Sequence, residues 1–105
     1  AMHNMRRETG CVLEVLDGVH LLVAILCRGM GVVIPLKLEG VVLQRSKWKL
    51  AKSVVEERFR MDKRVQVQFA YQDKAYISSR VYHGKGQEDL GRWLVLKELA
   101  YVEEV

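Results

Sequence analysis

An Asp-Gly dipeptide between two apolar runs is the feature that most constrains the fold of this chain. Asp17-Gly18 separates residues 11–16 from residues 20–28. Glycine accepts the positive φ of a tight turn without steric cost, so the pattern predicts a β-hairpin. Residues 20–28 are apolar on both faces, which is typical of a central strand.

A second short turn extends this pattern to a third strand. Residues 29–31 contain two glycines and lead into an apolar run over 32–42, which Pro35 interrupts. Parallel strands need a long crossover connection, so the short turns predict antiparallel pairing. Proline cannot donate to a strand ladder, and Pro35 therefore predicts an edge or a bend.

The spacing of the apolar residues changes to a helical period near residue 45. The apolar side of the predicted helix is formed by Trp48, Ala51, Val55 and Phe59. Ser46 is the predicted N-cap, and the helix is expected to end near residues 61–62. We interpret Trp48 as a core residue, because it lies on this apolar side.

The second half of the chain predicts two more strands and a second helix. Residues 65–71 alternate strictly between apolar and polar, as in a half-buried strand, and 72–74 form a turn. A further strand is expected over 75–82, a loop over 83–86 and a helix over 87–98. The residues of this helix that are expected to face inward are Leu90, Trp93, Leu94 and Leu96.

This order of elements predicts the fold class. Five antiparallel strands with a helix between the third and the fourth outline an all-β or α+β domain built on an OB-type barrel with two helices. At 105 residues the chain has room for one such domain, which we place at 10–105. Residues 1–9 are polar and are expected to form a flexible N-terminal segment.

The net charge of +4 is unevenly spread along the chain. Residues 1–43 sum to zero, 44–64 carry +5, 65–85 carry +2, and 86–105 carry −3. A basic middle and an acidic tail suit an anionic partner on one face. The alternative, an ordinary solvated surface, remains open at this point.

The cysteines and the hydropathy indicate the cellular environment in which we expect the chain. Cys11 and Cys27 lie in apolar strand-like runs, which favours buried free thiols over a disulfide and an intracellular, reducing environment. The longest apolar run is seven residues, 21–27, whereas a membrane-spanning helix needs about 20. No secretory signal is visible, so no membrane partner is expected.

Several segments in this order match a known pattern. Residues 15–20 are similar to an apolar-x-Asp-Gly-Asp-Thr hairpin, 36–41 to Val-Arg-Leu-x-Gly-Ile, 50–55 to the start of a helix with Ala-Lys-x-x-Leu, and 82–102 to a Gly-containing turn and helix ending in Gly-Leu-Ala. On these motifs the chain resembles the staphylococcal nuclease-like domain family over about residues 12–102. The resemblance implies the same OB-type barrel.

The departures from that family concern its chemistry. The resemblance implies that the two calcium-binding carboxylates fall at Val19 and Val42, and that the general base falls at Arg45, which cannot accept a proton at neutral pH. The two phosphate-clamping arginines fall at Lys37 and near Ala75. The resemblance therefore implies a pseudonuclease, with no catalytic residue, no bound metal and no cofactor.

Other chemical signals are few. Asp17 and His20 are interpreted as hairpin residues, and no P-loop or nucleophile motif occurs. Three tyrosines interleave with cations on the fourth and fifth strands, an arrangement that can stack bases and neutralise phosphates.

We hypothesise a non-catalytic module that binds RNA or single strands; the alternative is a protein-interaction or assembly module. The proposed binding residues are Lys37, Arg45, Lys49, Lys74, Tyr76, Arg80 and Lys85.

Overall fold

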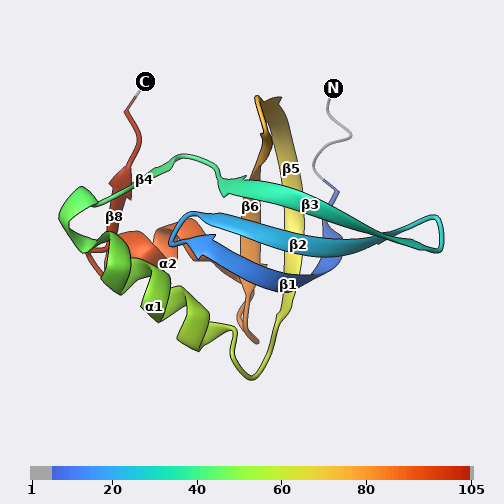
Figure 1. The fold of residues 1–105 in the computed structure, drawn as a ribbon, viewed down its shortest axis with the longest axis horizontal. Coiled ribbons are helices and arrows are strands. Elements are labelled where there is room, and N and C mark those ends of the chain that lie inside the picture. Colours follow the sequence, from blue (N-terminus) through green and yellow to red (C-terminus); the bar gives the residue numbers. More distant parts are fainter. Residues whose placement is uncertain (1–5, 105) are drawn as a thin grey trace.

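The computed structural model describes residues 6–104, apart from the side chain of Cys27 (Figure 1). In chain order its elements are β1 (Glu8–Asp17), β2 (His20–Cys27), β3 (Met30–Leu38), β4 (Val41–Leu43), the 3₁₀ helix η2 (Arg45–Lys47), α1 (Trp48–Arg58), β5 (Arg64–Asp73), β6 (Tyr76–His83), β7 (Glu88–Asp89), α2 (Leu90–Leu96) and β8 (Ala100–Val102).

The five long strands form a closed barrel. They lie in the order β3-β2-β1-β5-β6, and β3 pairs again with β6 to close the sheet. This confirms the predicted OB-type barrel with two helices. The neighbouring pairs are antiparallel, as the short connections predict for β1–β2, β2–β3 and β5–β6, whereas the closing pair is parallel and joins residues 36–38 to 77–79. β1 and β5 are far apart in the sequence, so their antiparallel pairing does not follow from a short connection. Parallel closure is possible here because the connection from β3 to β6 is long and includes α1 and β5.

The first hairpin forms where the sequence predicts it. β2 lies between β1 and β3, as expected for a strand with two apolar faces. β1 is longer than predicted, because Glu8 and Thr9 lie opposite Val67 and Gln66 of β5. These two residues belong to the segment that we expected to be flexible, and residues 1–5 of that segment lie outside the described part of the chain.

β3 ends earlier than the sequence predicts. The run over 32–42 divides into β3 and β4, and the break falls at Glu39-Gly40, where Gly40 has a φ of 78°. Pro35 lies within β3, opposite Leu22, and the pairing of β3 with β6 begins at the next residue. A free strand edge at Pro35 agrees with its missing N–H group.

The first helix differs from its prediction at its start. Residues 45–47 form η2, α1 begins at Trp48, and the N-cap position is Lys47 without a side-chain cap, so Ser46 is not the N-cap. The Trp48 side chain is 50% exposed, which contradicts its interpretation as a core residue. The helix buries Ala51 and Val55, one and two turns further on, and the half-buried Val54 also packs against the core.

The second helix is shorter than predicted. α2 begins after Asp89, whose carboxylate accepts a hydrogen bond from the backbone N–H of Arg92 at 3.2 Å. Leu90 and Leu94 are buried and Trp93 is half-buried, but Leu96 is 65% exposed and does not face inward. After this helix, residues 100–102 form β8, which pairs with β4.

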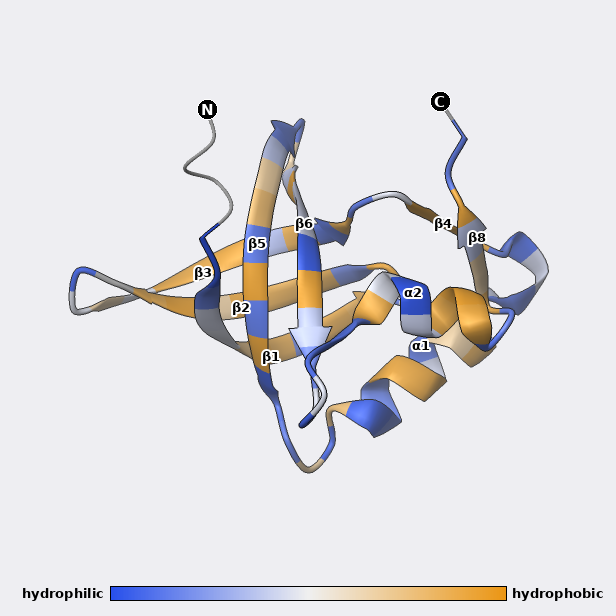
Figure 2. Cartoon of the chain, turned by 180° about the vertical axis from the view of Figure 1, so that it is seen from behind, coloured by the Kyte–Doolittle hydropathy of each residue, from blue (hydrophilic) through white to orange (hydrophobic). Residues whose placement is uncertain are grey.

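The core fills the barrel and the space between the barrel and the two helices. Apolar colour alternates along β5 and β6 in Figure 2, with the buried residues on the inner side. A β-bulge between Phe69 and Tyr71 interrupts this alternation. Tyr71 is therefore 56% exposed, although strict alternation places it with Val67.

Two further predictions concern thiols and membranes. Cys11 is a free thiol and is half-buried rather than buried, while the side chain of Cys27 lies outside the described residues. None of the helices within residues 6–104 is long and apolar enough to cross a membrane.

Candidate functional site

The turn of the first hairpin orients a histidine. The backbone N–H of Val19 donates to Oδ1 of Asp17 at 2.8 Å, and His20 Nδ1 lies 3.0 Å from both carboxylate oxygens. Partial burial by itself raises the pKa of Asp17, but the hydrogen bonds from His20 and Val19 hold that pKa below its usual 3.8. An ionised Asp17 accepts from Nδ1–H and leaves Nε2 as the second polar atom of the ring.

Lys37 and Tyr76 lie next to this histidine, on β3 and β6. The ring of Tyr76 is tilted against that of His20, with 4.5 Å between the centroids. Lys37 is directly opposite His20 in the β2–β3 ladder, and both point outward because Leu21 and Leu36 beside them are buried. We call Asp17, His20, Lys37 and Tyr76 the cleft cluster.

The ammonium group of Lys37 is held by the chain around it. Its Nζ lies 3.3 Å from the carbonyl oxygen of Leu38, 3.5 Å from that of Val41, and 4.0 Å from Oε1 of Glu103. These contacts are long, and Glu103 is well exposed, so a phosphate can replace this carboxylate with little loss.

A buried hydroxyl lies beside the cluster. Ser78 is opposite Lys37 in the parallel ladder and is 1% exposed. Its Oγ has no hydrogen-bond partner among the described residues. A buried hydroxyl without a partner costs stability, and a polar ligand over the cluster is one way in which such a group gains a partner.

Arg80 lies two residues further along β6 and is already paired. It contacts Asp89 Oδ2 at 3.0 Å and Glu39 Oε2 at 3.6 Å. The hydrogen bond to Asp89 raises the pKa of Arg80. Two carboxylates therefore surround this guanidinium, and its charge is largely compensated.

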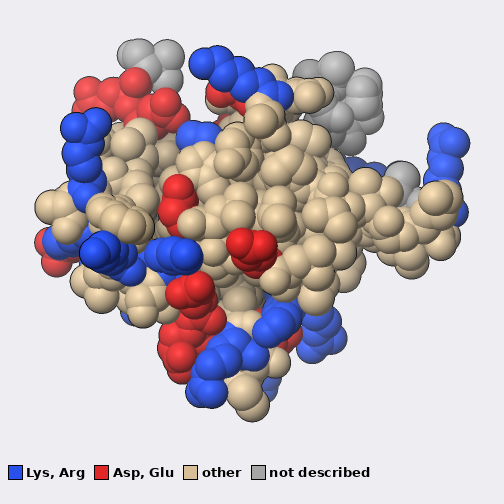
Figure 3. Space-filling view, in the orientation of Figure 1, with Lys and Arg blue, Asp and Glu red and all other residues tan. Residues whose placement is uncertain are grey.

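The other predicted binding residues do not join the cluster. Arg45 is exposed in η2, and Lys49 lies on α1 with its Nζ 5.5 Å from the centroid of the Trp48 ring. Lys74 and Lys85 are in the turns at opposite ends of β6, which is eight residues long and so spans about 26 Å. Figure 3 shows the cations in separate groups, with acidic side chains between them.

The positions at which the resembled family holds its metal are apolar. Val19 is 4% exposed and belongs to the core, and Val42 is half-buried in β4. Ala75, near which the resemblance implies a phosphate-clamping arginine rather than a metal ligand, is exposed in the β5–β6 turn. Within the described residues, no group of three or more His, Cys, Asp or Glu side chains is placed to hold a metal ion.

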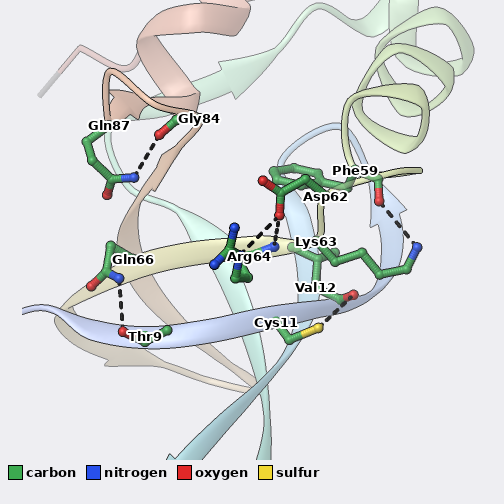
Figure 4. A network of polar contacts seen from close by, with 10 residues as sticks. All are labelled: Thr9, Cys11, Val12, Phe59, Asp62, Lys63, Arg64, Gln66, Gly84 and Gln87. Atoms are coloured by element: carbon green, nitrogen blue, oxygen red, sulfur yellow. Dashed lines mark hydrogen bonds and ion pairs between the residues drawn. The ribbon is translucent and has the colours of Figure 1, made fainter.

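A second groove contains polar residues that the sequence did not single out. Its lining includes Thr9, Asp62, Arg64, Gln66 and Gln87, together with the predicted Lys85. These residues come from β1, the loop before β5, the start of β5 and the loop after β6, and Figure 4 shows all of them except Lys85. They are far apart in the sequence, and no local spacing marks them as one site.

Comparison with known proteins adds no relative: no protein-family model matches the chain, and no curated protein matches it.

Proposed function

We propose that this domain binds single-stranded nucleic acid, RNA or DNA, without cleaving it by the chemistry of the nuclease family that it resembles. The observation that carries the proposal is the cleft cluster, in which an oriented imidazole, an ammonium group and a phenol ring lie on three adjoining strands.

Each group in the cluster suits a part of a nucleotide. The Tyr76 ring offers a face or edge on which a base can stack, and base stacking contributes about 1–3 kcal/mol. Lys37 supplies a charge for a phosphate, and the imidazole of His20 supplies an N–H donor or an acceptor at Nε2. The Asp17 contact fixes the ring, so less conformational entropy is lost when a ligand binds.

The absence of calcium-dependent cleavage rests on three substitutions. Val19 and Val42 offer no oxygen ligand from their side chains, and Arg45 cannot act as a base. A cation at residue 45 also removes the repulsion that a carboxylate exerts on a phosphate. Lost catalysis and retained binding are therefore compatible in physical terms.

The test is a titration of fluorescent RNA and DNA 10-mers at several salt concentrations. Lys37→Glu is expected to weaken binding to all sequences and to lower the salt slope by about 0.7, the value for one lost contact to a single strand. Lys52→Glu on α1 is the matched control with the same charge change. Lys37→Gln avoids a new repulsion with Glu103, and circular dichroism checks that each variant folds.

Two results would contradict the proposal. The first is a wild-type domain that binds neither nucleic acid at low salt. The second is a folded Lys37→Glu variant that binds as tightly as Lys52→Glu, because the cleft cluster is then not the binding site.

A second candidate function, protein interaction, is favoured by the exposed apolar residues of the β2–β3 hairpin. Leu26 and Met30 are each 70% exposed and Val33 is 56% exposed. The hairpin projects from the barrel (Figure 1), and Figure 3 shows few charges on it apart from its tip. An apolar interface of this kind responds little to salt, which distinguishes it from nucleic-acid binding.

A further inference from the structure

The groove beside β1 and β5 has a shape and a lining that suit a phosphate group. Its volume is about 480 Å³, and it lies between residues 9, 62–66 and 84–87. Arg64 and Lys85 provide two cations in the lining, against one carboxylate, that of Asp62. The groove is therefore open, polar and positive on balance.

Arg64 keeps most of its hydrogen-bonding capacity. Its Nε lies 3.5 Å from Oδ1 of Asp62, and the same oxygen accepts the backbone N–H of Arg64 at 3.1 Å. The backbone hydrogen bond is the main reason that the pKa of Asp62 is lowered. Because Asp62 contacts only Nε of this side chain, the two terminal nitrogens of the guanidinium can still bind a phosphate.

The loop after β6 lies against the last residue of α1. Gly84 has a φ of 75°, and Nη2 of Arg58 lies 3.0 Å from the point that a Cβ would occupy. Glycine adopts this positive φ without steric cost. The Gln87 side chain donates to the carbonyl oxygen of Gly84 at 2.9 Å and fixes the loop that carries Lys85.

Neutral donors and an aromatic ring continue the groove onto the barrel. Gln66 Nε2 donates to Oγ1 of Thr9 at 2.9 Å, as Figure 4 shows. Tyr82 is opposite Gln66 in the β5–β6 ladder, and the guanidinium of Arg7 lies 3.6 Å from the centroid of its ring. Amide groups and an aromatic ring next to cations are typical of a surface that binds single strands.

We infer that this groove binds a second phosphate of the same nucleic-acid strand that the cleft cluster holds, an inference that rests on the proposed function. Tyr76 belongs to the cleft cluster and Tyr82 lies beside the groove, and both are on the outer face of β6. They are six residues apart, so about 20 Å separates them. At about 3.4 Å per stacked nucleotide, a strand needs about six nucleotides to reach from one to the other.

The experiment compares the binding of single-stranded 3-mers and 10-mers to the folded domain. The double variant Arg64→Gln with Lys85→Gln removes two groove cations that are both exposed. The matched control is Arg92→Gln with Lys52→Gln, which removes one arginine and one lysine elsewhere.

We expect the groove variant to lose the gain in affinity from 3-mer to 10-mer, and its salt slope for the 10-mer to fall by about 1.4, the value for two phosphate contacts. Binding of the 3-mer at the cleft cluster should not change. If the wild type binds the 10-mer and the groove variant binds it equally well with the same slope, the groove is excluded and the proposed function stands. If the wild type binds no oligonucleotide, both fail.

Discussion

Replacing Phe59 by alanine is expected to destabilise the domain more than any surface change nearby. Phe59 follows the last turn of α1 and is 3% exposed. The centroid of the Phe59 ring lies 5.9 Å from the centroid of the His83 ring. The guanidinium carbon of Arg58 lies 5.4 Å from the centroid of the Phe59 ring. The ring therefore fills the space between the helix and the end of β6.

The magnitude follows from what truncation removes and what it leaves. The backbone N–H of Phe59 still donates to Val55 at 3.1 Å, and its carbonyl oxygen still accepts from Lys63 at 3.3 Å, so the loss is confined to the side chain. A buried Phe→Ala change costs about 3–5 kcal/mol. For a domain of this size each kcal/mol lowers the melting temperature by about 4–8 °C. A loss of about 3 kcal/mol at about 4 °C for each kcal/mol gives a fall of about 12 °C, which is the smallest change that we expect.

The assay is urea unfolding followed by circular dichroism, with Met61→Ala as the control. Met61 is also a large apolar side chain, two residues further on, but it is 85% exposed. Its truncation should change the free energy of unfolding by no more than about 0.5 kcal/mol. Equal unfolding midpoints for the two variants would refute the assignment of Phe59 to the core.

Three further predictions test other parts of the structure. Burial, with a smaller contribution from the Arg58 cation, lowers the pKa of His83 from 6.5, and neither ring nitrogen has a partner among the described residues. The unfolded chain therefore takes up this proton first as the pH falls below 6.5, and stability should drop from there downward. His83→Phe should flatten that part of the pH dependence of the urea midpoint, and an unchanged curve would show that His83 is not responsible. Gly18→Ala places a Cβ 2.7 Å from that of Ala51 and should cost about 1–3 kcal/mol, whereas Gly86→Ala meets open space and should be close to neutral in the same urea unfolding assay. Millimolar calcium should leave the melting temperature unchanged, because Val19 and Val42 replace the expected carboxylates; a clear rise that a chelator reverses would contradict this.

The spacing of apolar residues and the residue types in turns are local properties. The sequence therefore determined the elements that depend on them. The Asp17-Gly18 turn, the alternation that starts at residue 65 and the stripe of Ala51 and Val55 each follow from spacing within a short segment. Because the turns between the first strands are short, their antiparallel pairing follows as well. The closed barrel with two helices is the arrangement that buries these faces together.

The tertiary structure decided whatever depends on residues that are distant in the sequence. Trp48 lies at helical spacing with the core stripe, yet its side chain is 50% exposed, with the Nζ of Lys49 5.5 Å from the centroid of its ring. The bulge before Tyr71 turns that side chain outward, and no residue type at this position announces it.

The candidate sites depend most strongly on the tertiary structure. The parallel closure of β3 on β6 brings Lys37 and Tyr76 to His20, and the ladder between β1 and β5 places Thr9 beside Gln66. The sequence identified cations and aromatics that can bind nucleic acid, but it did not separate the paired Arg80 from the available Lys85. Charge is a property of the residue, whereas the carboxylates that neutralise it are supplied by the fold.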